Sequence, residues 1–240
     1  MAVSSAIDGE TLALVDGREV RLLGILAPAP PPNWDGPEPW PFELWAREAL
    51  SDLVLGVPVN LRFDARKVDR YGHVLAHVFT DGERSPTWVQ EALVARGLAR
   101  VAAQPDMAAC LKPLLAAEEK ARRARRGIWR SLTYQVRSAD DAKSLGYRRH
   151  SFQLVEGRVH GIGEGRSRVY INFAADWRQD FTIVVKRKRL PILEAAGLDL
   201  MRLPGQRIRV RGWIEWWNGP MIEIFHPHEI EVVDALTGAD

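Results

Sequence analysis

The fold of the first half of the chain is decided by the stretch Val20-Arg21-Leu22-Leu23-Gly24-Ile25-Leu26-Ala27-Pro28-Ala29. An apolar run at residues 11–15 precedes it, and the turn Asp16-Gly17-Arg18 joins the two. An Asp-Gly pair supplies the positive φ angle that a tight hairpin turn needs. We therefore expect a β-hairpin over residues 10–25, from which the first sheet grows.

Composition sets the outer limits of the fold and of the function. The 240 residues, 46% of them hydrophobic, are enough for two packed domains of ordinary size. With 33 Lys and Arg residues against 31 Asp and Glu residues, the formal net charge is only +2, so any basic surface must be local. Cys110 is the single cysteine, which excludes an intramolecular disulfide, and no Cys and His residues have the spacing of a zinc site.

Targeting signals give an expectation about location. No run reaches the ~20 apolar residues needed to span a bilayer, and residues 1–8 lack the basic start and apolar run of a signal peptide. We expect a cytoplasmic protein without a membrane partner. An export signal upstream of Met1 would change that expectation.

The first half of the chain predicts a mixture of strands and helices after the hairpin. Residues 28–41 contain seven of the 15 prolines, which predicts a long, stiffened loop. Apolar periodicity predicts helices at residues 42–55, 88–98 and 106–126, and strands at residues 57–63 and 74–79. Gly56 and Gly127 stand where the first and last of these helices should end.

The second half predicts a smaller, strand-rich domain. We expect a linker at residues 131–147, between a first domain at 1–130 and a second domain at 148–240. A short helix is expected at residues 191–196, between the third and fourth of five strands, which is the OB arrangement of a Greek-key barrel. The predicted fold class is mainly β with α (α+β). The five strands are expected at residues 152–159, 168–173, 181–185, 207–216 and 221–225.

Six motifs of the first half occur in a characteristic order. They are Ile7-Asp8-Gly9-Glu10-Thr11-Leu12, the strand Val20 to Ile25, Ala27-Pro28, Asp69-Arg70-Tyr71-Gly72, and residues 92–101 and 124–129. In their order and spacing, residues 7–129 resemble the thermonuclease (staphylococcal-nuclease-like) family. The resemblance implies an OB-fold barrel with three helices and calcium-dependent hydrolysis of DNA or RNA phosphodiesters.

The resemblance also implies which positions carry the reaction, and it predicts a centre that has largely lost them. Arg21 matches the first of two phosphate-binding arginines, and Glu10 matches the first acidic metal ligand. The second metal ligand is replaced by Leu26, and the water-activating glutamate is replaced by Ala29. The second arginine is replaced by His73, which lacks a bidentate fork and is only partly charged near neutral pH. Tyr71 matches a family position that contacts substrate.

The strand at residues 207–216 predicts a binding face in the second domain. A period of two places Arg207, Arg209, Arg211 and Trp213 on one face of the strand, with the apolar residues on the other, and Trp216 follows at the next turn. Cations and flat rings together are typical of sheets that bind single-stranded nucleic acid. The alternative is an ordinary strand face whose arginines pair with acids such as Glu215 or Glu223. Residues 152–233 also resemble the OB-like C-terminal module of some bacterial thermonuclease-family proteins, a resemblance that does not settle the module's function.

Three hypotheses follow. The first is a protein that binds nucleic acid, single-stranded in preference, with a weak or inactive phosphodiesterase centre and with no cofactor or resident metal. The second is an active nuclease that uses calcium and a replacement acid from Asp35, Glu38 or Glu43. The third is a scaffold that binds a protein partner in the cleft lined by Leu26 and Ala29.

Overall fold

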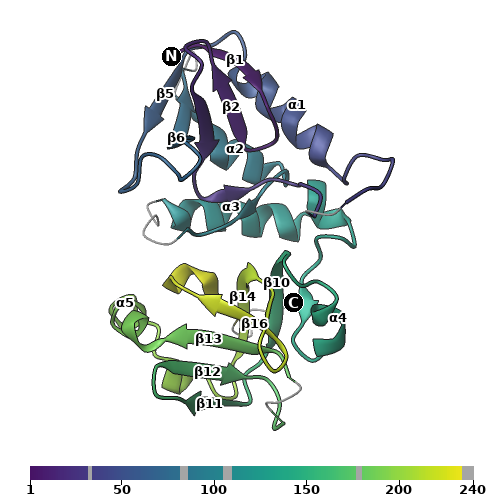
Figure 1. Cartoon of the computed structure of the whole chain (residues 1–240), viewed down its shortest axis with the longest axis vertical. Helices are drawn as coiled ribbons and strands as arrows, with labels where there is room; N and C mark the ends of the chain where they lie inside the picture. Colours follow the sequence, from purple (N-terminus) through teal and green to yellow (C-terminus); the bar gives the residue numbers. More distant parts are fainter. Residues whose placement is uncertain (32–33, 82–85, 105–109, 177–179, 234–240) are drawn as a thin grey trace. The chain divides into compact units, whose positions relative to one another are not determined.

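The computed structural model describes residues 1–31, 34–81, 86–104, 110–176 and 180–233. The chain forms two compact units, Met1–Tyr134 and Gln135–Asp240. Both combine strands with short helices, and the predicted α+β class is confirmed (Figure 1). No helix of the described residues is long and apolar enough to cross a membrane. The cytoplasmic location stays a prediction.

The first unit is built on a twisted sheet that contains the predicted hairpin. Strands β2 and β3 pair antiparallel, and Gly17 in their turn has a φ of 86°. Strand β3 then pairs in parallel with β6, and β5 lies at the edge of the sheet, as Pro58 predicts. The sheet runs in the order β1 (Val3–Ala6), β2 (Thr11–Leu14), β3 (Glu19–Leu22), β6 (Val74–Thr80) and β5 (Val59–Arg62), with β7 (Thr87–Trp88) also paired to β6.

Three helices cover this sheet, as expected. They are α1 (Glu43–Val54), α2 (Val89–Ala95) and α3 (Leu111–Arg123). Helix α2 packs against α3 and β6, and Leu50, Leu93 and Leu114 are buried in a core shared with the sheet. Residues 106–109 of the third predicted helix lie outside the described residues. Strands β4 (Ile25–Leu26) and β8 (Arg100–Val101) form a separate small ladder, and the 3-10 turn η1 (Gly127–Arg130) follows α3.

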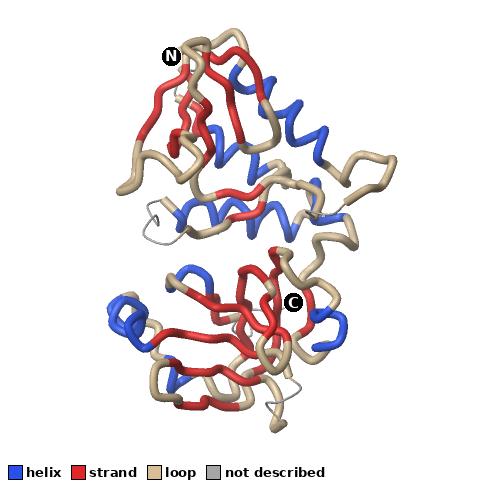
Figure 2. The backbone as a smooth tube through the Cα atoms, in the orientation of Figure 1, coloured by secondary structure: helices blue, strands red, loops and turns tan. Residues whose placement is uncertain are grey.

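The regular structure of the second unit is mostly strand, drawn red in Figure 2. Its first sheet runs β17 (Ile230–Val232), β14 (Arg207–Trp213), β10 (Phe152–Arg158) and β9 (Arg137–Ser138). Its second sheet runs β11 (Gly161–Glu164), β12 (Arg168–Asn172), β13 (Thr182–Lys186), β16 (Pro220–Ile224) and β15 (Glu215–Trp216). Helix α5 (Leu190–Ala195) lies between β13 and β14, as predicted, and β13 pairs in parallel with β16. The short 3-10 turns are η2 (Arg187–Arg189), η3 (Leu200–Arg202) and η4 (Pro227–Glu229).

The strand ladders of the predicted OB-like barrels are open. Among the described residues, the strand ladders do not close on themselves in either unit, and the second unit has two separate sheets. The two sheets of the second unit share one apolar core. Gly157 and Gly212 allow close approach there, because a Cβ would lie 2.8 Å from the ring of Phe173 at the first and 2.5 Å from Ile222 at the second.

The expected linker at residues 131–147 needs correction, because it contains regular structure. Strand β9 pairs in parallel with β10, and α4 (Ala142–Gly146) follows it. The Asp141 carboxylate caps α4 by accepting a hydrogen bond from the Ser144 N–H at 3.0 Å, and Leu145 is buried. The second unit therefore begins at Gln135 rather than at residue 148.

Candidate nucleic-acid interface

Glu10 and Arg21 are brought together by the first hairpin. Glu10 directly precedes β2, and Arg21 lies in β3 opposite Thr11. The Arg21 guanidinium donates a hydrogen bond to Glu10 Oε1, and the backbone N–H of Ala27 donates to Glu10 Oε2 at 2.7 Å. Glu10 is 7% exposed, and this burial raises the pKa of its carboxyl although the charge of Arg21 opposes the shift. Both oxygens of this carboxylate are therefore already engaged inside the protein.

The two side chains at the positions that should complete an acidic centre contain no oxygen ligand. Leu26 is half-buried in β4, where it pairs with Arg100, and Ala29 is exposed in the following loop. Asp8 is the nearby second carboxylate, and its Oδ1 accepts a hydrogen bond from the Glu10 N–H at 2.7 Å. Asp8 therefore helps to shape the loop before β2.

Calcium, the ion that the thermonuclease resemblance implies, does not fit this donor set. Ca²⁺ takes six to eight oxygen ligands, usually with several carboxylates. Within the described part of the chain, no group of three or more His, Cys, Asp or Glu side chains is placed to hold a metal ion. The side chains here supply one buried carboxylate that is tied to Arg21.

His73 and Tyr71 lie close together on the turn before β6. Asp69 organises this turn, since its carboxylate accepts from the Tyr71 N–H at 2.8 Å and contacts His73 Nδ1 at 2.9 Å. His73 Nε2 lies 3.1 Å from Glu19 Oε2. Partial burial raises the pKa of the Asp69 carboxyl, but the hydrogen bonds from His73 and Tyr71 outweigh burial and hold this pKa below its usual value. His73 thus faces two carboxylates, and no contact between described residues joins it to Glu10 or Arg21.

Tyr71 is the most open of the predicted site residues in the first unit. Its side chain is 67% exposed, and the Arg70 guanidinium lies 4.6 Å from the centre of its ring. The Tyr71 and His73 rings are 6.1 Å apart. The turn therefore presents an aromatic ring and a cation to solvent.

The acids of the proline-rich loop do not complete the centre. Asp35 and Glu38 are exposed. The Glu43 carboxylate accepts a hydrogen bond from the Trp40 N–H at 3.2 Å in the first turn of α1. Glu43 therefore stabilises the N-terminus of α1, where a negative charge is favoured.

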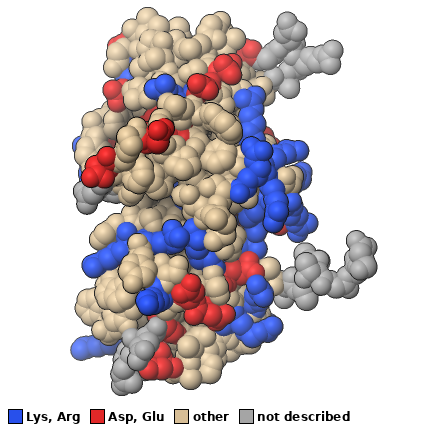
Figure 3. Space-filling model, turned by 90° about the vertical axis from the view of Figure 1, so that its right-hand side faces the viewer, with Lys and Arg blue, Asp and Glu red and all other residues tan. Residues whose placement is uncertain are grey.

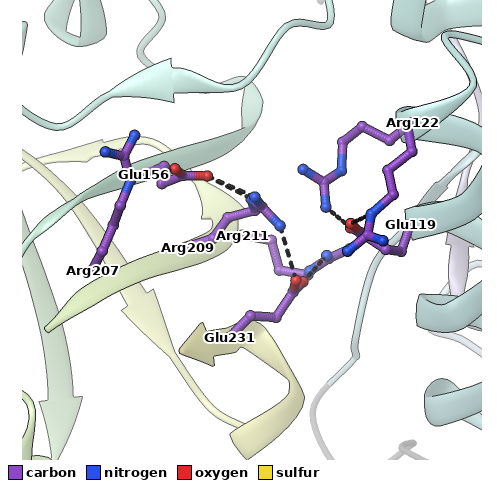
Figure 4. A network of polar contacts seen from close by, with 8 residues as sticks. Glu119, Arg122, Glu156, Arg207, Arg209, Arg211 and Glu231 are labelled. Atoms are coloured by element: carbon purple, nitrogen blue, oxygen red, sulfur yellow. Dashed lines mark hydrogen bonds and ion pairs between the residues drawn. The ribbon is translucent and has the colours of Figure 1, made fainter. Parts of the chain in front are cut away.

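The arginine strand of the second unit is not the open cationic face that the alternation predicts. Figure 4 shows Glu156 beside Arg207 and Arg209, and Glu231 beside Arg209 and Arg211. The Arg209 guanidinium lies 2.6 Å from Glu156 and 3.2 Å from Glu231. Arg209 and Arg211 are only 8% and 2% exposed. The prediction of an open face is wrong for these two residues, because strands β10 and β17 place carboxylates directly against them.

The two predicted tryptophans remain at the surface. Trp213 is 51% exposed and meets Phe152 edge-on at 6.0 Å between ring centres. Trp216 is 48% exposed and lies so close to Gly146 that a Cβ there would be 2.8 Å from its ring. Their role in binding stays a prediction, and the arginines expected beside them are held in ion pairs.

Sequence reasoning missed a cavity of about 410 Å³ on the other sheet of this unit. The signal was present in the strand Arg168-Val169-Tyr170-Ile171-Asn172, whose polar and apolar residues alternate with a period of two. The cavity is lined by Gly163, Glu164, Arg168, Tyr170, Asn172, Thr182, Val184, Trp217, Asn218 and Met221.

Comparison with known proteins identifies the first unit. Residues 19–131 match the family model described as "Staphylococcal nuclease homologue". These residues form a staphylococcal nuclease homologue domain. Over 104 aligned residues the chain is 32% identical to Endonuclease YncB of Bacillus subtilis (strain 168). The aligned region covers 42% of this chain and 47% of that relative. The chain thus spans about half the length of this curated relative. Arg21, Tyr71 and His73 lie inside the nuclease homologue domain, and Glu10 lies nine residues before its matched region.

Proposed function

We propose that this chain binds nucleic acid, single-stranded in preference, and that its nuclease homologue domain has a weak or inactive phosphodiesterase centre. The observation that carries the proposal is the state of Glu10. Both of its oxygens are engaged, by Arg21 and by the Ala27 N–H, and the side chains at positions 26 and 29 supply no carboxylate. Without a free base or a set of metal ligands, the hydrolytic step loses its main sources of rate.

Arg21 supports the binding half of the proposal. Its side chain is 37% exposed, and a guanidinium carries five N–H donors. Within the described residues, its side chain hydrogen-bonds only to Glu10, so further donors remain for a phosphate oxygen. Figure 3 shows lysine and arginine side chains gathered into patches on one face. Because the net charge of the chain is only +2, contacts with phosphates depend on such local patches.

The test is a binding titration of the whole chain. Labelled single-stranded DNA and RNA should bind at low salt and weaken as the salt concentration rises, because phosphate contacts release counterions. Arg21→Ala should weaken binding. Arg18→Ala is the matched control, because Arg18 is an exposed arginine in the same hairpin that pairs with Asp16. Absence of binding at low salt would contradict the proposal.

A second candidate is an active nuclease, and the name of the relative, an endonuclease, favours it. In this case Asp35 or Glu38 would supply the missing acid. The same DNA and RNA should be incubated with and without calcium. Calcium-dependent cleavage that is lost in Arg21→Ala and in Asp35→Asn or Glu38→Gln would support the active nuclease and contradict an inactive centre.

A further inference from the structure

The cavity of the second unit lies over the open face of the sheet formed by β11, β12, β13 and β16. Val169, Ile171, Ile183 and Ile222 of these strands are fully buried in the core. The residues that alternate with them therefore point to the opposite face, where they line the cavity. From β12, β13 and β16 they are Arg168, Tyr170, Asn172, Thr182, Val184 and Met221.

The hairpin between β15 and β16 adds an aromatic wall. Asn218 has a φ of 57° and Gly219 has a φ of 148°, so the chain turns back at once, and the Trp217 N–H donates to the Gly219 carbonyl at 3.0 Å. A Cβ at position 219 would lie 2.7 Å from the carbonyl oxygen of Asp180, so the turn needs glycine. Trp217, in the cavity wall, is 68% exposed. A large ring is thus held at the rim by a tight turn and is left open to solvent.

The charges around the cavity leave one cation available. Lys186 lies 2.5 Å from Glu223, and Arg187 lies 2.6 Å from Glu164. The Arg168 guanidinium, by contrast, has no carboxylate partner among the residues that the structure describes. The cavity therefore combines one available guanidinium with rings, amides and a hydroxyl.

We propose that this cavity binds one base and the adjoining phosphate of a single-stranded nucleic acid. Tyr170 and Trp217 provide ring faces for stacking, Asn172, Thr182 and Asn218 provide donors and acceptors for the edge of the base, and Arg168 provides the phosphate contact. The volume of about 410 Å³ lies within the range of pockets that hold a small molecule. A single available cation suits one phosphate better than an acidic peptide. The proposal extends nucleic-acid binding to the second unit and rests on nucleic acid being the ligand of the chain.

The experiment measures two probes on the full-length chain, a fluorescein-labelled short oligothymidylate and thymidine 5′-monophosphate. Trp217→Ala and Tyr170→Ala should each weaken oligothymidylate binding about 5- to 150-fold, the range expected for loss of one stacked base. Trp217→Phe keeps a ring and should retain most of the affinity. Arg168→Ala should remove about one phosphate contact. The slope of the logarithm of the binding constant against the logarithm of the salt concentration should then become shallower by about 0.7. Trp45→Ala is the matched control, because Trp45 is similarly exposed on α1 and does not line the cavity.

The outcomes separate this proposal from the proposed function. If oligothymidylate binds and Arg21→Ala weakens it, but Trp217→Ala and Tyr170→Ala do not, the cavity is overturned and nucleic-acid binding stands. If thymidine monophosphate binds and is lost in Trp217→Ala while oligothymidylate does not bind, the cavity takes a free nucleotide, and both the single-strand proposal and the proposed function are overturned. If neither probe binds, the cavity is overturned. Circular dichroism of each variant shows that the fold is retained.

Discussion

The two units share one kind of parallel strand pairing but place their charges differently. In each, a strand pairs in parallel with a later strand across a helix, β3 with β6 around α1 and β13 with β16 around α5. In the first unit, one half-exposed arginine, Arg21, faces one buried carboxylate. In the second unit, the arginine strand is held by Glu156 and Glu231, and the available cation, Arg168, lies on the other sheet. The partners across each strand, and not the strand pattern itself, decide which arginine can meet a ligand.

The largest expected effect tests whether the arginine strand is structural. Arg211→Ala should lower the free energy of unfolding of the second unit by about 3 kcal/mol, because it removes a buried guanidinium and its packing from Glu231, which keeps Arg209 as a partner. Arg207→Ala should cost less than about 1 kcal/mol, since the Arg207 side chain is 60% exposed. Denaturant unfolding of both variants measures the difference. An equal loss of unfolding free energy in the two variants would contradict the distinction between buried and surface arginines.

A pH effect of similar size is expected at the end of the same sheet. Glu229 is 6% exposed and accepts hydrogen bonds from the N–H groups of Phe225 and His226 at 2.6 and 2.7 Å. Burial raises its pKa to about 7, although these N–H groups and the Arg211 charge oppose the shift. Between the ordinary value of 4.5 and about 7, the folded state binds more protons than the unfolded state, so stability falls as the pH rises through this window.

Glu229→Gln should remove that slope, which amounts to about 3 kcal/mol across the window. Unfolding measured at a series of pH values checks the effect, with Glu215→Gln, an exposed glutamate of β15, as the control. An unchanged pH slope in Glu229→Gln would show that Glu229 ionises in the folded protein much as it does in the unfolded chain.

A smaller effect is expected in the first unit. Arg21→Ala should destabilise it by about 1–3 kcal/mol, because Glu10 would stay buried without its charged donor. The double variant Arg21→Ala with Glu10→Gln should recover part of this loss, since no charge is then left buried. Thermal unfolding measures both variants. Full stability of Arg21→Ala alone would show that the pair adds nothing to the fold and would sharpen the view of Arg21 as a ligand contact.

The smallest expected effect concerns the cavity. Trp217→Ala should change the free energy of unfolding by less than about 0.5 kcal/mol, because the side chain is 68% exposed. Denaturant unfolding beside Trp213→Ala checks this. A loss of several kcal/mol would make Trp217 a packing residue and would weaken its assignment as a binding wall.

Much of the fold could be predicted because its signals are local. The Asp16-Gly17 turn, the helix ending before Gly56 and the Asn218-Gly219 turn appear where the residues indicate, with φ angles of 86°, 76° and 57° at Gly17, Gly56 and Asn218. The short strands β4, β8 and β9 were missed, since pairs of two residues have no periodicity to read. The position of a large apolar residue was not readable in the same way, since Trp45 of α1 is 56% exposed. The helix packs inward through smaller side chains, Ala46 and Ala49.

The candidate sites also combine features that the local sequence fixes with features that depend on packing. The sequence by itself determined that positions 26, 29 and 73 lack the acids and the arginine of a nuclease centre, because residue identity is independent of packing. It also determined the alternation that puts Arg209 and Arg211 on one face of a strand. Only the tertiary structure decided that Glu156 and Glu231 neutralise that face and that Tyr170, Arg168 and Trp217 gather at one cavity. The pairing of strands joins residues 20 to 53 positions apart, and no local pattern carries that information.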